Sequence, residues 1–151
     1  KNLFLFNNGQ YEEYLQKIGS AVEGIQFSDD GKKLLFWSTN EISVHFLRDW
    51  NVQPLRAENE TKEITRYSEK ISNVQWFKDY EHIIFSVGPF VKIAELDNRD
   101  YRICNDLLTT SIDNSRIVYN HYLEKMFFSD QGESGNFFSI DIPEKTTFLG
   151  L

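Results

Sequence analysis

Apolar and polar residues alternate in short runs along this chain, and the runs recur in one arrangement. In residues 24–44, reading GIQFSDDGKKLLFWSTNEISV, Ile25 and Phe27 precede a polar turn, a dense apolar run and a second alternating run. Short runs with period two, bounded by Gly, Asp and Ser, are typical of β-strands. The Asp-Gly pair at 30–31 tolerates the left-handed backbone of a tight hairpin. We predict three short antiparallel strands in this stretch.

The same pattern returns at residues 76–86 and 119–129. In each copy an aromatic residue ends the first strand, and an apolar triplet begins seven positions later, at Leu34, Ile83 and Met126. Periods of about 40–50 residues with four strands each are typical of β-propellers, whose sheets, or blades, bury their faces by stacking. The sequence therefore predicts an all-β fold, a partial β-propeller of about three and a half four-stranded antiparallel blades.

The predicted division places the last two strands of an incomplete blade at 1–19 and three further blades at 20–67, 68–107 and 108–151. The expected strands are Leu3–Phe6, Tyr11–Ile18, Gly24–Ser28, Lys33–Ser38, Glu41–Leu47, Lys62–Tyr67, Asn73–Phe77, His82–Val87, Phe90–Leu96, Tyr101–Cys104, Arg116–Asn120, Lys125–Asp130, Asn136–Ile142 and Thr146–Leu149. Because a closed propeller must cover its terminal sheet edges, we expect either a fragment of a larger ring or association of two copies, and we favour the fragment.

Composition narrows the class of partner. The formal net charge is −7 and the basic residues are scattered singly, which argues against a nucleic-acid groove. No apolar run is long enough to insert into a membrane. The single cysteine, Cys104, excludes an internal disulfide and is interpreted as a small buried strand residue.

The sequence contains no recognisable catalytic or metal-binding pattern. The three histidines, His45, His82 and His121, have no ligand spacing, and no nucleophile elbow or phosphate-binding loop occurs. The Asp-Asp-Gly at 29–31 lacks the alternating ligands of a calcium loop and reads as a turn. We therefore predict no catalytic residue, no cofactor site and no metal site.

One irregular insertion interrupts the repeat at Arg48–Thr61 and carries Trp50, Pro54 and Arg56 among charged residues. Exposed tryptophan and arginine often anchor protein partners, whereas buried tryptophan fills cores. We interpret Trp76 as a core residue, because it occupies the first-strand aromatic position that it shares with Phe27 and Tyr119. Trp50, Pro54 and Arg56 are the candidate partner-binding residues, and packing of Trp50 on the blade edge is the alternative.

The aromatic, Ser-Asp-Asp-Gly-Lys-Lys and apolar succession resembles WD40-like and TolB-type propeller repeats. The segments ITRY at 64–67, ISNVQW at 71–76 and VKIAELDNRD at 91–100 resemble the C-terminal propellers of PEGA-domain proteins of candidate-phylum bacteria, which are envelope-anchored. This likeness covers most of residues 20–107. It implies an extracytoplasmic location, with anchoring through parts outside this chain, while a cytoplasmic location stays open.

These observations predict a non-catalytic segment, not an enzyme, that acts as a protein-protein or cell-envelope interaction scaffold. The expected partner is a protein or an envelope polymer. One alternative is an accessory propeller that gates a larger hydrolase. Another is a half-ring that completes itself by self-association through open sheet edges.

Overall fold

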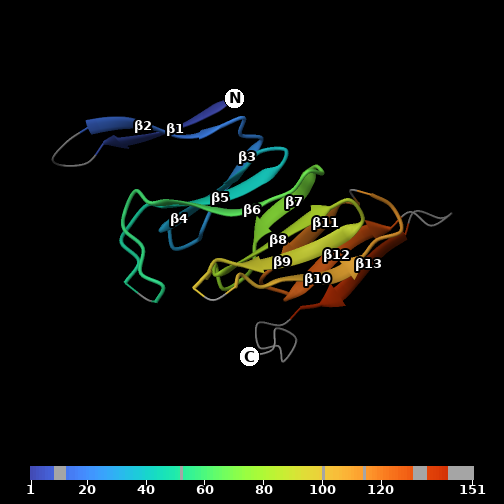
Figure 1. The fold of residues 1–151 in the computed structure, drawn as a ribbon. Coiled ribbons are helices and arrows are strands. Elements are labelled where there is room, and N and C mark those ends of the chain that lie inside the picture. The colour runs from blue at the N-terminus through green and yellow to red at the C-terminus, as the bar shows by residue number, and fades with distance from the viewer. Residues whose placement is uncertain (9–12, 52, 100, 114, 131–135, 143–151) are drawn as a thin grey trace. The chain divides into compact units, whose positions relative to one another are not determined.

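The computed structural model describes residues 1–8, 13–51, 53–99, 101–113, 115–130 and 136–142. Every regular element among them is a β-strand, and the strands form four antiparallel sheets of two to four strands (Figure 1). The all-β class and the succession of antiparallel sheets predicted for a partial propeller are confirmed. No helix in the described residues is long and apolar enough to cross a membrane. The chain divides into two compact units, Lys1–Ser68 (unit 1) and Glu69–Leu151 (unit 2), and each is described by itself.

Unit 1 contains a two-stranded and a four-stranded sheet, each with its strands in chain order. The first sheet pairs β1 with β2, and the second pairs β3 to β6 in sequence. The strands are β1 Asn2–Asn8, β2 Glu13–Ser20, β3 Gly24–Phe27, β4 Lys33–Trp37, β5 Glu41–Phe46 and β6 Thr61–Arg66.

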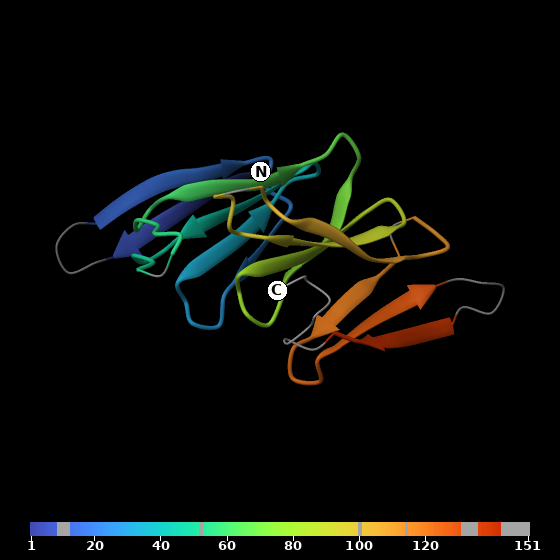
Figure 2. The same ribbon diagram turned by 60° about the horizontal axis from the view of Figure 1, so that its bottom comes forward.

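Unit 2 contains a four-stranded sheet and a three-stranded sheet, visible separately in Figure 2. The strands are β7 Ile71–Trp76, β8 His82–Val87, β9 Phe90–Glu95, β10 Cys104–Thr109, β11 Ile117–Asn120, β12 Lys125–Asp130 and β13 Asn136–Asp141. The two sheets share one core of apolar side chains, formed by Phe77, Ile84, Val91, Ile93, Ile117, Tyr119, Met126 and Ile142.

The repeated hairpins have the same strand register, as the seven-residue spacing predicts. The terminal aromatic of each first strand lies opposite the first apolar residue of the next strand, in the pairs Phe27 with Leu34, Trp76 with Ile83 and Tyr119 with Met126. Trp76 and Tyr119 are buried, as expected for core residues. Phe27, at the same position, is not a core residue, because 54% of it is exposed.

The turn between β3 and β4 is built by short polar side chains, as its composition predicts. Ser28 Oγ donates to Asp30 Oδ1 at 2.6 Å and accepts from the Lys33 amide at 2.9 Å. Gly31 has a φ of 66°, a left-handed conformation in which glycine has no steric penalty. These bonds explain the Asp-Asp-Gly stretch as a hairpin turn.

The fourth strand of the second predicted blade lies at Cys104–Thr109 and not at Tyr101–Cys104. It therefore extends past the predicted blade limit at residue 107. The charged residue Asp106 interrupts the apolar pattern from which this strand would be predicted. In the structure Asp106 forms a cross-strand ion pair with Lys92, with 2.5 Å between Nζ and Oδ1. Charged residues on an edge strand discourage pairing with other chains. The interpretation of Cys104 as buried is wrong, since this residue is exposed.

Side-chain amides connect the two sheets of unit 2. The Asn73 side chain donates to Ser115 O at 2.7 Å and accepts from the Ile117 amide at 3.2 Å. Gln75 accepts from the Tyr119 amide at 2.8 Å. These bonds satisfy backbone groups in β11 and just before it, on the side where no strand of the described residues pairs with β11. The first strands of successive sheets are therefore joined through side chains.

The predicted final strand, Thr146–Leu149, lies outside the described residues.

Candidate functional site

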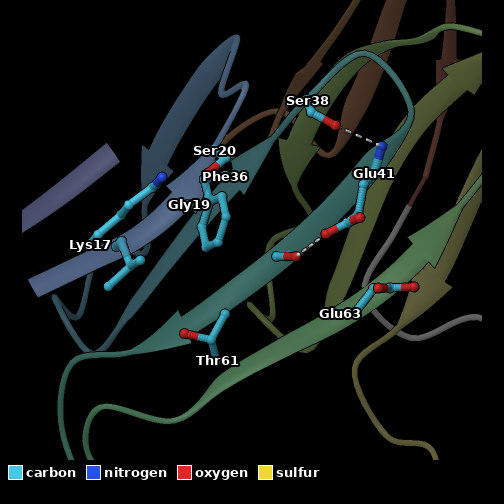
Figure 3. A pocket seen from close by; sticks show the side chains of 10 residues that line it. Lys17, Gly19, Ser20, Phe36, Ser38, Glu41, Thr61 and Glu63 are labelled. Atoms are coloured by element: carbon cyan, nitrogen blue, oxygen red, sulfur yellow. Dashed lines mark hydrogen bonds between the residues drawn. The ribbon is translucent and has the colours of Figure 1, made fainter. Parts of the chain in front are cut away.

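A polar groove of about 500 Å³ lies within unit 1, between β2 and the face of the β3–β6 sheet (Figure 3). β2 contributes residues 17–20, and the sheet contributes residues from β4, the β4–β5 turn, β5 and β6. The lining residues are Lys17, Ile18, Gly19, Ser20, Phe36, Ser38, Glu41, Ser43, Thr61 and Glu63.

One wall of the groove forms where the backbone of β2 at Gly19 lies close to the Phe36 ring. A side chain at Gly19 would place its first carbon 2.9 Å from Phe36 Cε2 and from Val22 Cγ2. Only glycine lets β2 approach the sheet this closely. Phe36 is buried in this contact, so its ring closes the groove but does not offer a wide aromatic surface.

Strand alternation places polar side chains on the groove face of the sheet. Ser43 lies opposite both Phe36 and Glu63, and His45 lies opposite Thr61. Because side chains two residues apart share a face, Glu41, Ser43 and His45 all belong to this side of β5. The intervening residues of β5 carry the apolar side chains of the opposite face.

Two polar side chains at the rim are held by hydrogen bonds. Ser38 Oγ accepts from the amide of Glu41 at 3.1 Å and from that of Asn40 at 3.3 Å. Arg66 Nη2 donates to Glu41 Oε2 at 2.5 Å, and Ser43 Oγ donates to Glu41 Oε1 at 3.4 Å. The Glu41 carboxylate is thus oriented, and its charge is offset by Arg66.

The remaining charges of the groove balance each other. Lys17 and Glu63 are both exposed and contribute one cation and one anion. The hydrogen bond from Arg66 to Glu41, and the charges of Glu41 and Glu63, raise the pKa of Arg66. No hydrogen bond or ion pair to another described residue uses the Lys17 ammonium or the Ser20 hydroxyl. Both groups can therefore bind a ligand without first losing a protein partner.

A buried histidine lies on the groove side of β5, next to the lining residues. His45 is fully buried, and its Nδ1 lies 2.8 Å from Oγ1 of the groove residue Thr61. Its Nε2 is buried and has no hydrogen-bond partner among the described residues. Burial lowers the pKa of His45, because a charged imidazole loses its hydration there. His45 is therefore neutral in the folded protein near pH 7.

Acidification should destabilise unit 1 through His45. The imidazole takes up a proton near pH 6.5 when unfolded but resists protonation when folded, so stability falls as pH drops below about 6.5, by at most about 1.4 kcal/mol per pH unit. Amide hydrogen exchange of Val44 and Phe46 between pH 7.5 and 5.0, corrected for intrinsic exchange, measures this loss. The variant His45→Gln should flatten the profile, and an unchanged slope in that variant would refute the assignment.

The pKa of His82, in unit 2, is shifted in the opposite direction to that of His45. Burial alone would lower its pKa, but the hydrogen bond from Nδ1 to Asp79 Oδ2, 2.7 Å long, and the Asp79 charge outweigh burial and raise it. Its contribution to stability is present below about pH 6.5 and is lost as pH rises through the folded pKa. Neither His45 nor the His82–Asp79 pair belongs to a metal-binding cluster, because no three candidate ligand side chains lie together in the described part of the chain.

The three residues predicted to bind a partner lie in the insertion of unit 1. Trp50 and Arg56 form a backbone pair, with N to O distances of 2.8 and 3.0 Å. Trp50 is half-buried, and Lys33 Nζ lies 4.0 Å from its ring centroid, as a cation–π contact requires. Pro54 is also half-buried, and only 12% of the Arg56 side chain is exposed. The structure brings Trp50 and Arg56 together, and partner binding by Trp50, Pro54 and Arg56 stays a prediction.

Sequence reasoning did not find the groove, although one signal was present. Glu41, Ser43 and His45 alternate with apolar residues in a strand that the hydrophobic pattern already identified. Ser43 and His45 are buried, and buried polar groups need partners that the core cannot supply. A run of polar residues on one face of a central strand therefore indicated a lined depression.

Comparisons with known proteins identify no family for this chain. No family model matches the chain, and no curated protein matches it. Among solved structures, the chain is similar to one from Bacteroides fragilis described as "a putative 6-phosphogluconolactonase", with a TM-score of 0.49 and 13% identity. The match covers 92% of this chain and 48% of the other, so the chain spans about half the length of that protein.

This comparison corrects the functional class predicted from the sequence. The non-catalytic scaffold, and with it the prediction that the chain is not an enzyme, is withdrawn, because the protein that the chain resembles is described as an enzyme. At 13% identity and a TM-score of 0.49 the likeness assigns no activity, substrate or catalytic residue to this chain.

Proposed function

We propose that unit 1 binds a small, neutral, polyhydroxylated ligand, such as a saccharide, in the groove between β2 and the β3–β6 sheet. The observation that carries this proposal is the lining of the groove, which combines hydroxyl groups with balanced charges. A volume of about 500 Å³ lies within the range of small-molecule sites.

Hydroxylated ligands suit the groove because its lining contains both hydrogen-bond donors and acceptors. Lys17 supplies donors and Glu63 supplies acceptors, while Ser20 can do both. Hydrogen bonds to charged groups contribute about 1.5–3 kcal/mol, more than bonds between neutral groups. A ligand with several hydroxyl groups can use these residues together.

The same lining disfavours other ligand classes. A nucleotide would bring two or more phosphate charges to a groove in which Lys17 is the only cation among the lining residues. An apolar ligand would bury the Glu41 and Glu63 carboxylates without replacing their hydration.

We also propose a relationship for the repeats and a source for the ligand. The shared register of the three hairpins supports repeats of the WD40-like or TolB type, and most of residues 20–107 resembles the propellers of PEGA-domain proteins. A location outside the cytoplasm would give the groove access to envelope saccharides.

Binding can be measured by titrating ¹⁵N-labelled protein with maltose, cellobiose and N,N′-diacetylchitobiose. We expect at least one saccharide to shift the amide resonances of residues 41–43 and 61–63, with a dissociation constant in the range of about 1 mM. The variant Glu63→Gln removes a charged acceptor and should weaken binding about tenfold.

Lys62 provides the matched control. It is the neighbour of Glu63 on β6, and strand alternation directs it to the other face of the sheet, so Lys62→Gln should bind like the parent protein. The proposal fails when none of the three saccharides shifts the groove amides. It also fails when Lys62→Gln weakens binding as much as Glu63→Gln does.

A further inference from the structure

The sheet formed by β1 and β2 has two strands fewer in the described residues than the four-stranded repeats of the same chain. The two full repeats in the described residues, β3–β6 and β7–β10, each have four strands in chain order. β1 pairs only with β2, so one edge of β1 has no strand beside it in the described part. A two-stranded sheet is marginally stable in water, and an open edge is a template for another strand.

Apolar side chains are exposed beside this open edge. The register places Phe4 opposite Lys17 and Phe6 opposite Leu15, so the three apolar residues share the face of Lys17. The exposed fractions are 52% for Phe4, 60% for Phe6 and 67% for Leu15. Phe6 also lines a cavity of about 220 Å³ together with Phe27 of β3.

Unit 2 shows what covers the position equivalent to Phe27. Tyr119 has the same register position in its hairpin, but it is buried, and its ring stacks on Phe77 with 5.0 Å between centroids. Phe77 follows β7, in the first hairpin of the preceding sheet. In unit 1 the described residues form only β1 and β2 in the preceding sheet, with no first hairpin beside them, and Phe27 is exposed.

The backbone amides of Tyr119 and Phe27 differ between the two units in the same way as their side chains. In unit 2 the Gln75 side chain of β7 accepts from the amide of Tyr119, on the open side of β11. The corresponding backbone group in unit 1 belongs to Phe27, on the open side of β3. No equivalent strand supplies an amide side chain to it in the described residues. Both the apolar surface and the hydrogen-bonding edge therefore require the same kind of element.

We propose that the open edge of β1 and the exposed side chains of Phe4, Phe6, Ile25 and Phe27 form a docking site for a β-hairpin with the pattern of β7–β8. The second strand of that hairpin pairs with β1, and its first strand covers Phe27. The site continues the packing of Gly19 and Val22 against Phe36, which already joins the two sheets of unit 1. A second copy of this chain cannot supply the hairpin, because β3–β4, β7–β8 and β11–β12 are already paired within their own sheets.

A graft tests the proposal. Residues 71–89 contain β7, β8 and the Gly88-Pro89 turn, and a copy of them placed before Asn2, in place of Lys1, would lead into β1 as β8 leads into β9. We expect hydrogen exchange of the β1 amides to slow at least tenfold. Exchange of Met126 in unit 2, which the graft does not touch, serves as the reference for folding.

The control is the same graft with its apolar triplet, copied from Ile83, Ile84 and Phe85, replaced by serine. Protection of β1 in the first graft and not in the control supports a docked hairpin. Equal exchange in the two grafts, or no protection in either, overturns the proposal. It is also overturned when the parent chain protects β1 by itself and sediments as a dimer, because a second copy then covers the edge.

Discussion

Replacing Asn73 with alanine should lower the free energy of unfolding of unit 2 by about 2–4 kcal/mol. The side chain donates to Ser115 O and Ser86 Oγ at 2.7 and 3.0 Å and accepts from the Ile117 amide at 3.2 Å. Leaving a buried donor or acceptor unsatisfied costs about 1–3 kcal/mol. Asn73 also has a φ of 53°, a left-handed conformation that costs alanine about 1 kcal/mol.

The variant Asn73→Gly separates these two causes. Glycine adopts the left-handed backbone without strain but still lacks the hydrogen bonds, so its loss should be about 1 kcal/mol smaller than that of alanine. Urea-dependent hydrogen exchange of the Ile84 amide measures unit 2 by itself. Losses below about 0.5 kcal/mol in both variants would show that the amide bonds contribute nothing to the joining of the two sheets.

Met126→Ala should destabilise unit 2 at least as much, by about 2–5 kcal/mol. Met126 is fully buried in the core that the two sheets of unit 2 share, among residues that include Ile84 and Tyr119. Removing most of its side chain leaves a cavity that strands on both sides cannot fill without losing their register. The same exchange experiment on Ile84 gives the value.

Phe127 is the matched control for Met126. It is adjacent on β12, lies on the opposite face of the sheet by alternation and is 37% exposed. Phe127→Ala should cost about 1 kcal/mol or less, because it loses only cross-strand contacts with Val118 and Ser139. Equal losses for the two variants would mean that the two faces of this sheet are equally packed, contrary to the structure.

The sequence predicts the hairpins of this fold well because turn chemistry and alternation agree there. Ser28, Asp30 and Gly31 make the bonds that their residue types suggest, and the apolar triplets start the strands that they mark. The prediction fails at β10, where Asp106 interrupts the apolar pattern and only its ion pair with Lys92 on the neighbouring strand makes the charge compatible with a sheet. Such a cross-strand partner is invisible before the register is known.

Burial was harder to predict than strand position. Phe27 and Tyr119 have the same local sequence pattern and the same register, yet one is exposed and the other buried. The difference arises from the neighbouring sheet, which in unit 2 supplies Phe77. Local periodicity indicates which face a side chain takes but not whether another sheet covers that face.

The candidate groove could not be predicted from the sequence for a related reason. Its lining combines β2 with residues from β4 to β6, so it exists only once the two sheets of unit 1 pack together. The sequence directed attention to Trp50 because tryptophan in an insertion is conspicuous. The structure explains part of that position by the contact between Trp50 and Lys33, a pair that sequence spacing does not suggest.

The register of the repeated hairpins also determines which changes in chain length the protein tolerates. One extra residue inside β8, directly after Ile83, would move every later side chain of that strand to the opposite face of its sheet and exchange core for solvent. Loss or duplication of a whole repeat, cut in the polar connections between sheets, leaves every pairing of the others intact. Such a chain can change its length in evolution by whole sheets far more readily than by single residues.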